Sequence, residues 1–408
     1  MAFNILEHVT FAYQPIWGPK RQLIGVRLRV RALHPDSVDA AHLLEVLEDE
    51  WSHDAPFLLV SFTDQTQLLQ ALAFNPHDSI WLELPDFGEY TPPQVVQAVA
   101  LARRVGHRLV QRAPLARARP MGNGTGAKNF RYLLDLWPEQ VAQAMVSAQQ
   151  KGQPGAQQTP LLPEQLYHRI GTRALAAHVL DDAKGWGVCG WPAEDVLKAH
   201  QRYGVPVDRR TLVRVQQALM HESSMDAVEH LIHQDAVLTH RVLRLVNSPL
   251  FGSTRQVETV RQALFLLGQT RLRDWLLELM PGSATDVDLF PVRQSLVLRG
   301  KLMAQLMNAG AQNNLATEIY VTGLFSGLAQ LTNEPLGVAL GRVPVADAVS
   351  DALLRQSGPY HVYLDIARRM EDPEQVEHLS TFCAEADFSL DQVNRALLRT
   401  LSQWRNVI

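Results

Sequence analysis

The spacing of apolar residues changes about halfway along the chain. In the first half, short apolar runs alternate with stretches in which apolar residues recur every three or four positions. The first kind predicts β-strands and the second predicts amphipathic α-helices. Their alternation is typical of a parallel sheet, so we predict an α/β architecture for this half. From Asp208 onward the strand-like runs disappear and helical spacing continues, which predicts an all-α second half.

The first half divides into predicted strands and helices. Runs rich in β-branched and aromatic residues predict strands over residues 9–16, 23–33, 57–62, 79–84 and 107–111. Helices are predicted over residues 38–51, 66–74, 92–105 and 165–183, and the segment WGVCGW closes the half. The stretch 145–164 is rich in Gln, Gly and Pro, which predicts a flexible insertion.

The second half is predicted to be a helical bundle that follows a domain boundary. Pro192, Gly204 and Pro206 interrupt the pattern, so we place one domain at residues 1–195 and the other at residues 205–408. Helical spacing covers residues 211–220, 225–233, 270–280, 289–309, 315–331, 345–354 and 360–370, followed by two helices that end near Trp404.

Residues 234–268 predict a further pair of helices around a polar corner. Asp235 is placed to cap the first helix, because an aspartate at this position accepts hydrogen bonds from free amides. Asn247, Ser248 and Pro249 end that helix, since proline disfavours helical dihedrals in the residue before it. Gly268 follows the second helix and tolerates a positive φ. We predict that side chains of the corner satisfy the helix end.

Length and composition narrow the class of protein. A chain of 408 residues is long for a single core and predicts about two domains. Its net charge of −4 gives no basic excess, so we expect no nucleic-acid partner. The segment MAFNILEHVTFAYQP lacks the cationic start and apolar core of a signal peptide, and no apolar run is long enough to span a bilayer, so we expect no direct membrane insertion. Cys189 and Cys383 lie far apart without a histidine pattern, which fits a reducing compartment, and we predict a cytoplasmic location.

The polar corner also carries a family resemblance. Asp235 followed by LRLVNSPLFG, a polar break and QALFLLG resembles the HDOD domain, and the resemblance continues through SLVLRGKLMAQLM, YVTGLFSGLAQL and VSDALL. HDOD domains are helical modules of bacterial signalling proteins, related to HD-type metal-dependent phosphohydrolases but without their metal ligands. Ser326 and Gly327 lie where the HD motif GLLHD has its ligands, and neither can replace an imidazole and a carboxylate. Ala236 replaces the proline that commonly follows the opening aspartate.

The first half resembles a second family. It contains YQPIWGPKRQLIGVRLRVRALHP, which is similar to the opening of the EAL domain, a TIM-barrel phosphodiesterase that cleaves cyclic di-GMP with divalent metal ions. Proteins that join a degenerate EAL-like region to an HDOD domain form a bacterial family, and the domain order here matches. This half is shorter than a complete barrel of that family, so we predict an incomplete, degenerate EAL-type (β/α) barrel with one or more βα units missing.

Most residues that the resemblance assigns to EAL chemistry are replaced. Arg27 stands where the family has the glutamate that names the domain. The replaced positions are Arg27, Arg29, Ser61, Gln111, Arg112, Ala113 and Cys189, whereas Arg31 and Glu83 match the family. Two-metal hydrolysis needs several carboxylates around the cations, and Arg27 would place a permanent positive charge where a dication binds. We therefore predict no catalytic residues, no metal site, no cofactor and no enzymatic activity.

Three arginines remain as candidates for ligand binding. Arg27, Arg29 and Arg31 share one face of a predicted strand. One interpretation is a half-buried strand with a solvated basic face. The other is an anion site, because guanidinium groups match phosphate geometry.

Two further patterns are interpreted as structural. The histidines are interpreted as surface or cap residues, because no carboxylate or cysteine set completes a metal site: they are His221, His230, His233 and His240. The segment GNGTGAK at residues 122–128 is interpreted as a loop, because its spacing differs from that of a phosphate-binding Walker loop.

Together these observations predict a non-catalytic signal-transduction adaptor that acts through contacts with regulatory proteins in a cyclic di-GMP-related network. The first alternative is a receptor that binds cyclic di-GMP, or another anionic nucleotide, without hydrolysis. The second alternative is a residual cyclic di-GMP phosphodiesterase. A DNA-binding regulator is disfavoured by the negative net charge. No oligomeric state follows from the sequence.

Overall fold

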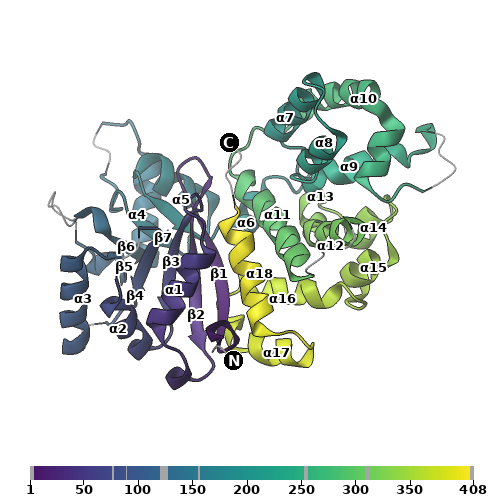
Figure 1. Ribbon diagram of the computed structural model, residues 1–408. Helices are drawn as coiled ribbons and strands as arrows, with labels where there is room; N and C mark the ends of the chain where they lie inside the picture. Colours follow the sequence, from purple (N-terminus) through teal and green to yellow (C-terminus); the bar gives the residue numbers. More distant parts are fainter. Residues whose placement is uncertain are drawn as a thin grey trace. The chain divides into compact units, whose positions relative to one another are not determined.

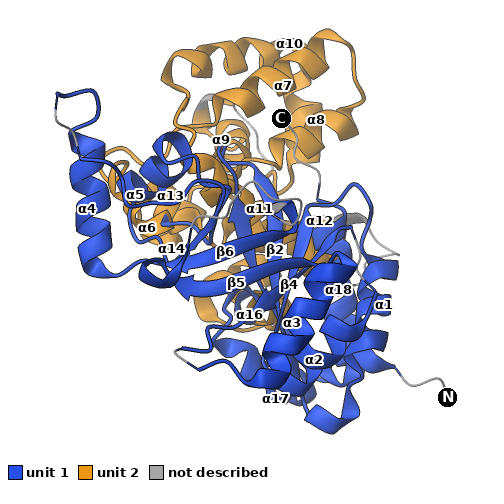
Figure 2. Cartoon of the chain, turned by 90° about the vertical axis from the view of Figure 1, so that its left-hand side faces the viewer, with its two compact units in different colours: residues 1–192, 368–408 blue, residues 193–367 orange. Residues whose placement is uncertain are grey.

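A computed structural model describes residues 4–75, 78–88, 90–119, 127–154, 157–251, 256–307 and 313–404. The chain forms two compact units, one of residues 1–192 together with 368–408 and the other of residues 193–367 (Figure 2). Most of the segment GNGTGAK lies outside the described residues, so its predicted loop is not described. No helix within the described ranges is both long and apolar enough to cross a membrane.

The first unit is built on a closed barrel whose strands follow one another in chain order (Figure 1). They are β1 (Val9–Trp17), β2 (Leu23–Ala32), β3 (Phe57–Phe62), β4 (Ile80–Leu84), β5 (Arg108–Pro114), β6 (Phe130–Asp135), β7 (Leu166–His168) and β8 (Gly187–Cys189). Strand β1 runs antiparallel to both β2 and β8, and the remaining neighbours are parallel. The prediction of an incomplete barrel is therefore wrong, because these strands close the ring.

Strands β6 and β7 account for most of the difference. Neither was predicted, and β7 begins the stretch 165–183 that was predicted to be helical; helix α5 (Arg173–Ala177) occupies only part of that stretch. A strand of three residues is too short to show an alternation in sequence. Parallel pairing with β6 on one side and β8 on the other holds it in place. The barrel is therefore completed by pairing between strands that carry little local signal.

Helices cover the outside of the barrel, and three of them begin at side-chain caps. They are α1 (Ala40–Glu50), α2 (Gln65–Ala73), α3 (Pro93–Val105), α4 (Pro138–Gln149) and α5. The Asp39 carboxylate accepts a hydrogen bond from the Ala41 amide, and Asp64 caps α2 in the same way. Helix α4 extends into the stretch predicted as a flexible insertion, and residues 155–156 of that stretch lie outside the described residues.

The C-terminal segment returns to the barrel unit. It contains α17 (Leu379–Glu385) and α18 (Leu390–Ser402), and Figure 1 shows α18 in yellow alongside β1 and α1. The Asn394 side-chain amide donates to the carbonyls of Leu6, at 2.8 Å, and Val9, at 2.9 Å. The contacts of residues 368–408 are thus those of the barrel unit, whereas the sequence assigns them to a helical domain at 205–408. The predicted domain division stays a prediction.

An apolar layer fills the interior of the barrel toward the amino ends of the parallel strands. One buried side chain from each contributing strand meets the others in this layer: Ile16, Leu59, Trp81, Val110, Leu133, Leu166 and Cys189. Beneath it, Trp186 stacks on Phe57 with ring centroids 4.6 Å apart and meets Trp81 at 5.1 Å. These aromatic rings pack against the apolar layer at the amino end of the barrel.

The second unit is all helical. Its helices are α6 (Ala193–Lys198), α7 (Arg209–Met220), α8 (Met225–Ile232), α9 (Ala236–Val246), α10 (Val260–Leu279), α11 (Leu289–Leu306), α12 (Asn313–Phe325), α13 (Leu328–Thr332), α14 (Leu336–Leu340) and α15 (Asp347–Ser350); α16 (His361–Glu371) spans the boundary with the first unit. Gly268 has φ 66° and interrupts α10 with a kink, so its predicted positive φ is confirmed.

The predicted structural role of the corner after α9 is confirmed. Asn247 donates from its side-chain amide to the carbonyls of Leu243, at 2.7 Å, and Val257, at 2.9 Å, and its side-chain oxygen accepts from the Val257 amide. The Ser248 hydroxyl donates to the Leu245 carbonyl at 2.7 Å. These bonds satisfy the end of α9 and fix the chain that leads into α10.

Candidate functional site at the carboxyl end of the barrel

Charged side chains follow the apolar layer on the same inward face of the strands. We call this set the charged layer: Arg27 and Arg29 on β2, Glu83 on β4, Arg112 on β5, Asp135 on β6 and His168 on β7. Alternate residues of a strand face the same side, so Asp135 and His168 lie one step above Leu133 and Leu166 of the apolar layer. The carboxyl ends of parallel strands meet at one rim of a barrel, where loops usually build a functional site.

Arg27 and Glu83 form a buried, two-pronged ion pair. The Arg27 Nε donates to Glu83 Oε2 at 2.6 Å and the second guanidinium nitrogen donates to Oε1 at 2.6 Å. Their side chains are only 6% and 3% exposed. Burial alone would lower the pKa of Arg27, but the attraction and hydrogen bonds of Glu83 raise it, so the guanidinium stays charged. Because Arg27 is buried, the interpretation of this strand face as solvated fails at this residue.

A second charged group spans β5, β6 and β7. The Arg112 Nε donates to Asp135 Oδ2 at 2.9 Å, and His168 Nδ1 lies 3.1 Å from Asp135 Oδ1. Burial by itself would raise the pKa of Asp135, but the hydrogen bonds from His168 and Arg112 lower it to about 2. Asp135 is therefore an anion at any physiological pH, and it orients both neighbours.

Arg29 has no such neutralising partner. Its side chain makes no hydrogen bond or ion pair with another residue in the described part of the chain. Burial and repulsion from Arg27, with a further contribution from Arg112, lower the pKa of Arg29. In the charged layer, three guanidinium groups face two carboxylates, so one positive charge is left over. The structure thus places the three sequence candidates differently: Arg27 is paired, Arg29 is unpaired, and Arg31 lies further along β2.

Arg31 meets the returning C-terminal segment. One of its guanidinium nitrogens lies 3.1 Å from a Glu377 carboxylate oxygen, and the two side chains are 36% and 62% exposed. Nearby, the Thr10 hydroxyl donates to the Val376 carbonyl at 3.0 Å. Thr10 pairs with Arg31 across the β1–β2 ladder, at the end of β2 that belongs to the carboxyl rim. The segment around Glu377 therefore lies beside the candidate site.

Other positions assigned by the EAL resemblance are held by neutral contacts. Gln111 donates to the Pro85 carbonyl at 2.8 Å. The Cys189 thiol donates to the Gln14 side-chain oxygen at 3.1 Å, and burial raises the pKa of Cys189 to about 12, so it stays a neutral thiol. Across the described ranges, no three His, Cys, Asp or Glu side chains gather closely enough to hold a metal ion.

In the second unit, a hydrogen-bonded network occupies the position of the HD motif. The Ser326 hydroxyl donates to the Gly323 carbonyl at 2.6 Å and accepts a hydrogen bond from Arg299 at 2.7 Å. His240 is buried and its Nε2 lies 2.9 Å from the Ala339 carbonyl. These groups tie helices of the unit together.

The chain therefore combines an α/β barrel unit with a helical unit. The carboxyl rim of the barrel carries one arginine whose charge no carboxylate of the charged layer neutralises. Residues 205–332 match the model of the HDOD domain. The match supports an HDOD domain in the C-terminal half of the chain.

The chain is similar in part to a curated protein and to several solved structures. The chain is 27% identical over 199 residues to a Vibrio cholerae serotype O1 protein named Cyclic di-GMP phosphodiesterase CdgJ, with 48% of this chain and 46% of that protein covered. It thus spans less than half the length of this relative. Among solved structures, the MmoQ response regulator of Methylococcus capsulatus is 18% identical with a TM-score of 0.38 and 48% of this chain and 98% of that chain covered. Klebsiella pneumoniae BlrP1, in a calcium/cy-diGMP complex, is 14% identical with a TM-score of 0.30 and 47% and 57% covered.

The prediction that the chain has no enzymatic activity is contradicted by these comparisons, because a relative is named as a phosphodiesterase. The prediction rested on counting metal ligands at the positions of one motif. Such a count takes no account of chemistry at other residues, and it omitted the carboxylate of Asp135 and the imidazole of His168 at the rim.

Sequence reasoning found β2 and its arginines but missed their partners. Asp135 and His168 were not considered because the strands that carry them were not recognised. Glu83 was noted as a match to the EAL family, and its pairing with Arg27 joins residues 56 positions apart. The available signal was the apolar-to-charged change at the end of each run, LLD and LYH, which marks the carboxyl end of a barrel strand.

Proposed function

We propose that this chain acts in cyclic di-GMP-related signalling in the cytoplasm, where its degenerate EAL-like barrel binds an anionic nucleotide at the charged layer and its helical half contacts regulatory proteins. Three findings support the proposal: the HDOD match, the relative named as a cyclic di-GMP phosphodiesterase, and the uncompensated charge of Arg29. Cyclic di-GMP is the expected ligand, because its phosphodiesters are anions that guanidinium groups recognise.

Arg29 is the observation that carries the proposal. A half-buried guanidinium next to two further arginines is held at a cost, since burial and like-charge repulsion both oppose its charge. A bound phosphodiester would lower that cost by neutralising the excess charge. Arg27 and Arg112 cannot serve equally well, because Glu83 and Asp135 already occupy them.

Replacing Arg29 should weaken nucleotide binding without unfolding the barrel. We expect Arg29→Ala to raise the Kd for cyclic di-GMP about 10- to 100-fold, which corresponds to the loss of one charge-assisted hydrogen-bonded contact. Isothermal titration calorimetry on the full chain measures the effect. Arg104→Ala is the matched control, because Arg104 is exposed near the end of α3, which leads into the amino end of β5 and not into its carboxyl end. Equal Kd values for the wild type and Arg29→Ala would contradict the assignment of this arginine.

Glu377 should oppose the same ligand. Its carboxylate lies beside Arg31 and contributes a negative potential at Arg29. We expect Glu377→Gln to lower the Kd for cyclic di-GMP about two- to fivefold, a modest change because the side chain is exposed and screened. Glu374→Gln removes the same charge from an exposed residue of the same segment and should leave the Kd unchanged. Identical effects of the two variants would show a general charge effect instead of a local one.

Hydrolysis of cyclic di-GMP is a second candidate function, favoured by the name of the Vibrio cholerae relative. Incubating the purified chain with cyclic di-GMP and magnesium or manganese, and separating the products chromatographically, tests it. Metal-dependent turnover would be established if linear dinucleotide forms above the level of a buffer control and does not form when a chelator is added.

Co-purification from native cytosol, followed by identification of the bound proteins, tests the proposed contacts with regulatory proteins.

A further inference from the structure

A short acidic segment of the barrel unit lies at its carboxyl rim. We call residues 372–378 the acidic strap; they follow α16, they contain three carboxylates and no lysine or arginine, and they include the helical turn Gln375–Glu377. The amide of Glu374 donates to the Asp372 side chain at 2.9 Å, at the start of the segment. The acidic strap therefore keeps its shape partly through bonds within itself.

Thr10 holds the acidic strap on the inner side of the rim. Thr10 pairs with Arg31 across the β1–β2 ladder, and paired residues of a ladder point to the same side. Arg31 follows Arg27 and Arg29 at alternate positions of β2, so it shares the face that carries the charged layer. The buried Thr10 hydroxyl donates to the Val376 carbonyl at 3.0 Å, and Val376 is only 2% exposed. The acidic strap is thus bonded to the wall of the barrel from its inner face.

Glu377 meets the outermost arginine of this row. Its carboxylate lies 3.1 Å from a guanidinium nitrogen of Arg31. Burial and Arg27 lower the pKa of Arg29, and Glu377 is one of the carboxylates that oppose this lowering. A carboxylate is an anion that guanidinium groups bind as they bind a phosphodiester. Glu377 therefore offers the row of arginines an internal substitute for a ligand.

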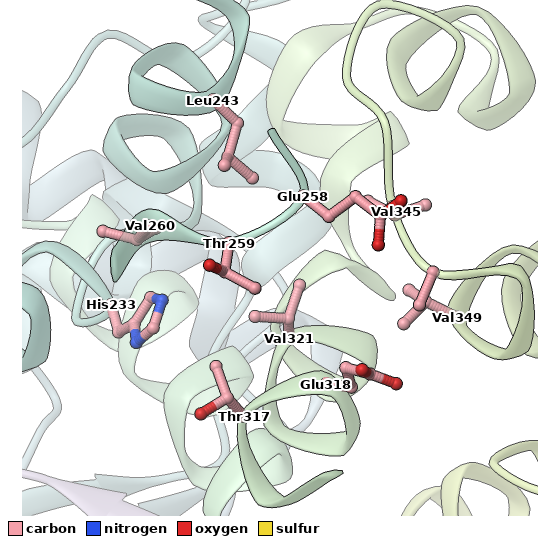
Figure 3. A pocket seen from close by; sticks show the side chains of 11 residues that line it. His233, Leu243, Glu258, Thr259, Val260, Thr317, Glu318, Val321, Val345 and Val349 are labelled. Atoms are coloured by element: carbon pink, nitrogen blue, oxygen red, sulfur yellow. The ribbon is translucent and has the colours of Figure 1, made fainter. Parts of the chain in front are cut away.

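The acidic strap is connected on both sides to anchored parts of the chain. Tyr360 precedes α16 and donates to Glu318 Oε2 at 2.8 Å, and Figure 3 shows Glu318 beside a small pocket of the helical unit. After the acidic strap, the chain continues through α17 to α18, whose Asn394 donates to the carbonyls of Leu6 and Val9. A segment tethered in this way is present at the rim at a high effective concentration, so weak contacts suffice for it to compete with a ligand.

We propose that the acidic strap is an autoinhibitory contact, which closes the rim to an anionic ligand and which the ligand displaces from Thr10 and Arg31. The inference rests on the proposed nucleotide site and adds how that site is regulated. Acidic strap and ligand exclude one another because both bring negative charge to the same arginines. Each therefore lowers the affinity of the rim for the other by the same factor.

Modification of arginines with phenylglyoxal tests the acidic strap without any nucleotide. Mass spectrometry of the full chain gives the reaction rate of each arginine. Thr10→Val removes the hydroxyl that holds the Val376 carbonyl, and we expect Arg29 and Arg31 to react at least threefold faster in this variant. Thr10→Ser keeps a hydroxyl and should react like the wild type. Arg104 is exposed on α3 and serves as the reference within each sample.

Hydrogen exchange with and without cyclic di-GMP tests the displacement. The amides of residues 372–378 should exchange faster when the nucleotide is bound, and Thr10→Val should lower the Kd about three- to tenfold, the contribution of one hydrogen bond. Thr400→Val is the matched control, because its buried hydroxyl donates to the Ala396 carbonyl, at 2.7 Å, within α18. This variant should leave the Kd, the exchange of the acidic strap and the arginine modification unchanged.

Three results would overturn the inference. They are equal arginine modification in the wild type and Thr10→Val, equal effects of Thr10→Val and Thr400→Val, and slower exchange of the acidic strap in the nucleotide complex, which would make it a lid that closes on the ligand. If cyclic di-GMP binds neither the wild type nor Thr10→Val, the proposed function is contradicted, and the phenylglyoxal rates alone decide whether the acidic strap shields the arginines. Circular dichroism establishes that each variant is folded.

Discussion

Arg27→Ala is expected to lower the free energy of unfolding of the barrel unit by about 3–5 kcal/mol, because it leaves the Glu83 carboxylate buried and unpaired. Glu83→Ala should have a similar effect for the converse reason. The joint replacement Arg27→Met with Glu83→Leu should regain most of the loss, since it removes both charges from the apolar interior. Urea denaturation followed by tryptophan fluorescence measures the effect, because Trp81 and Trp186 lie inside the barrel.

An exposed ion pair of the same unit gives the comparison. Arg108 lies 3.1 Å from Asp78, and the Asp78 side chain is 88% exposed. Arg108→Ala should cost at most about 1 kcal/mol, because solvent screens such pairs. If Arg27→Ala were no more destabilising than Arg108→Ala, the buried pair would not have the structural role assigned to it here.

Asp235→Ala is expected to have an effect of similar size on the helical unit, about 3–5 kcal/mol. Asp235 is fully buried, and one carboxylate oxygen caps α9 by accepting from the amides of Val237 and Leu238. The other oxygen accepts from Arg293 at 2.6 Å and from the Asp208 amide at 2.7 Å. Removing the carboxylate therefore leaves a buried guanidinium and several amides without their acceptor. Hydrogen exchange of the α9 amides measures the loss locally.

Asp235→Asn separates the cap from the charge. Asparagine caps helices about as well as aspartate, so this variant should retain the N-cap bonds and lose the ion pair with Arg293. We expect its stability to fall between those of the wild type and Asp235→Ala. A variant as stable as the wild type would mean that Arg293 contributes little to holding the unit together.

The two buried pairs also bear on function. In the barrel, Glu83 and Asp135 each neutralise one arginine, and this leaves Arg29 as the charge that a ligand can meet. The same pairs hold the rim in one arrangement before any ligand arrives. A preorganised site of this kind loses less conformational entropy on binding than a flexible one.

Sequence by itself determined the helical half in considerable detail. Local rules sufficed there: Asp235 was identified as a cap, Asn247 as a helix end and Gly268 as a position of positive φ, and the structure confirms each. These features depend on residues within a few positions of one another. The hairpin of β1 and β2 and the strands β3, β4 and β5 were also recognised, because each has a long enough apolar run.

Tertiary structure alone decided how the barrel closes and which charges are paired. Strand β7 has three residues and is specified by its two neighbours, not by its own pattern. The partners of Arg27 and Arg293 lie 56 and 58 positions away, and Asn394 bonds to Leu6 across 388 positions. Periodicity reports only the face of an element that is buried, so it carries no information on which distant element meets that face. That choice depends on the packing of the whole unit, and it determines that Arg29 is the arginine left unpaired.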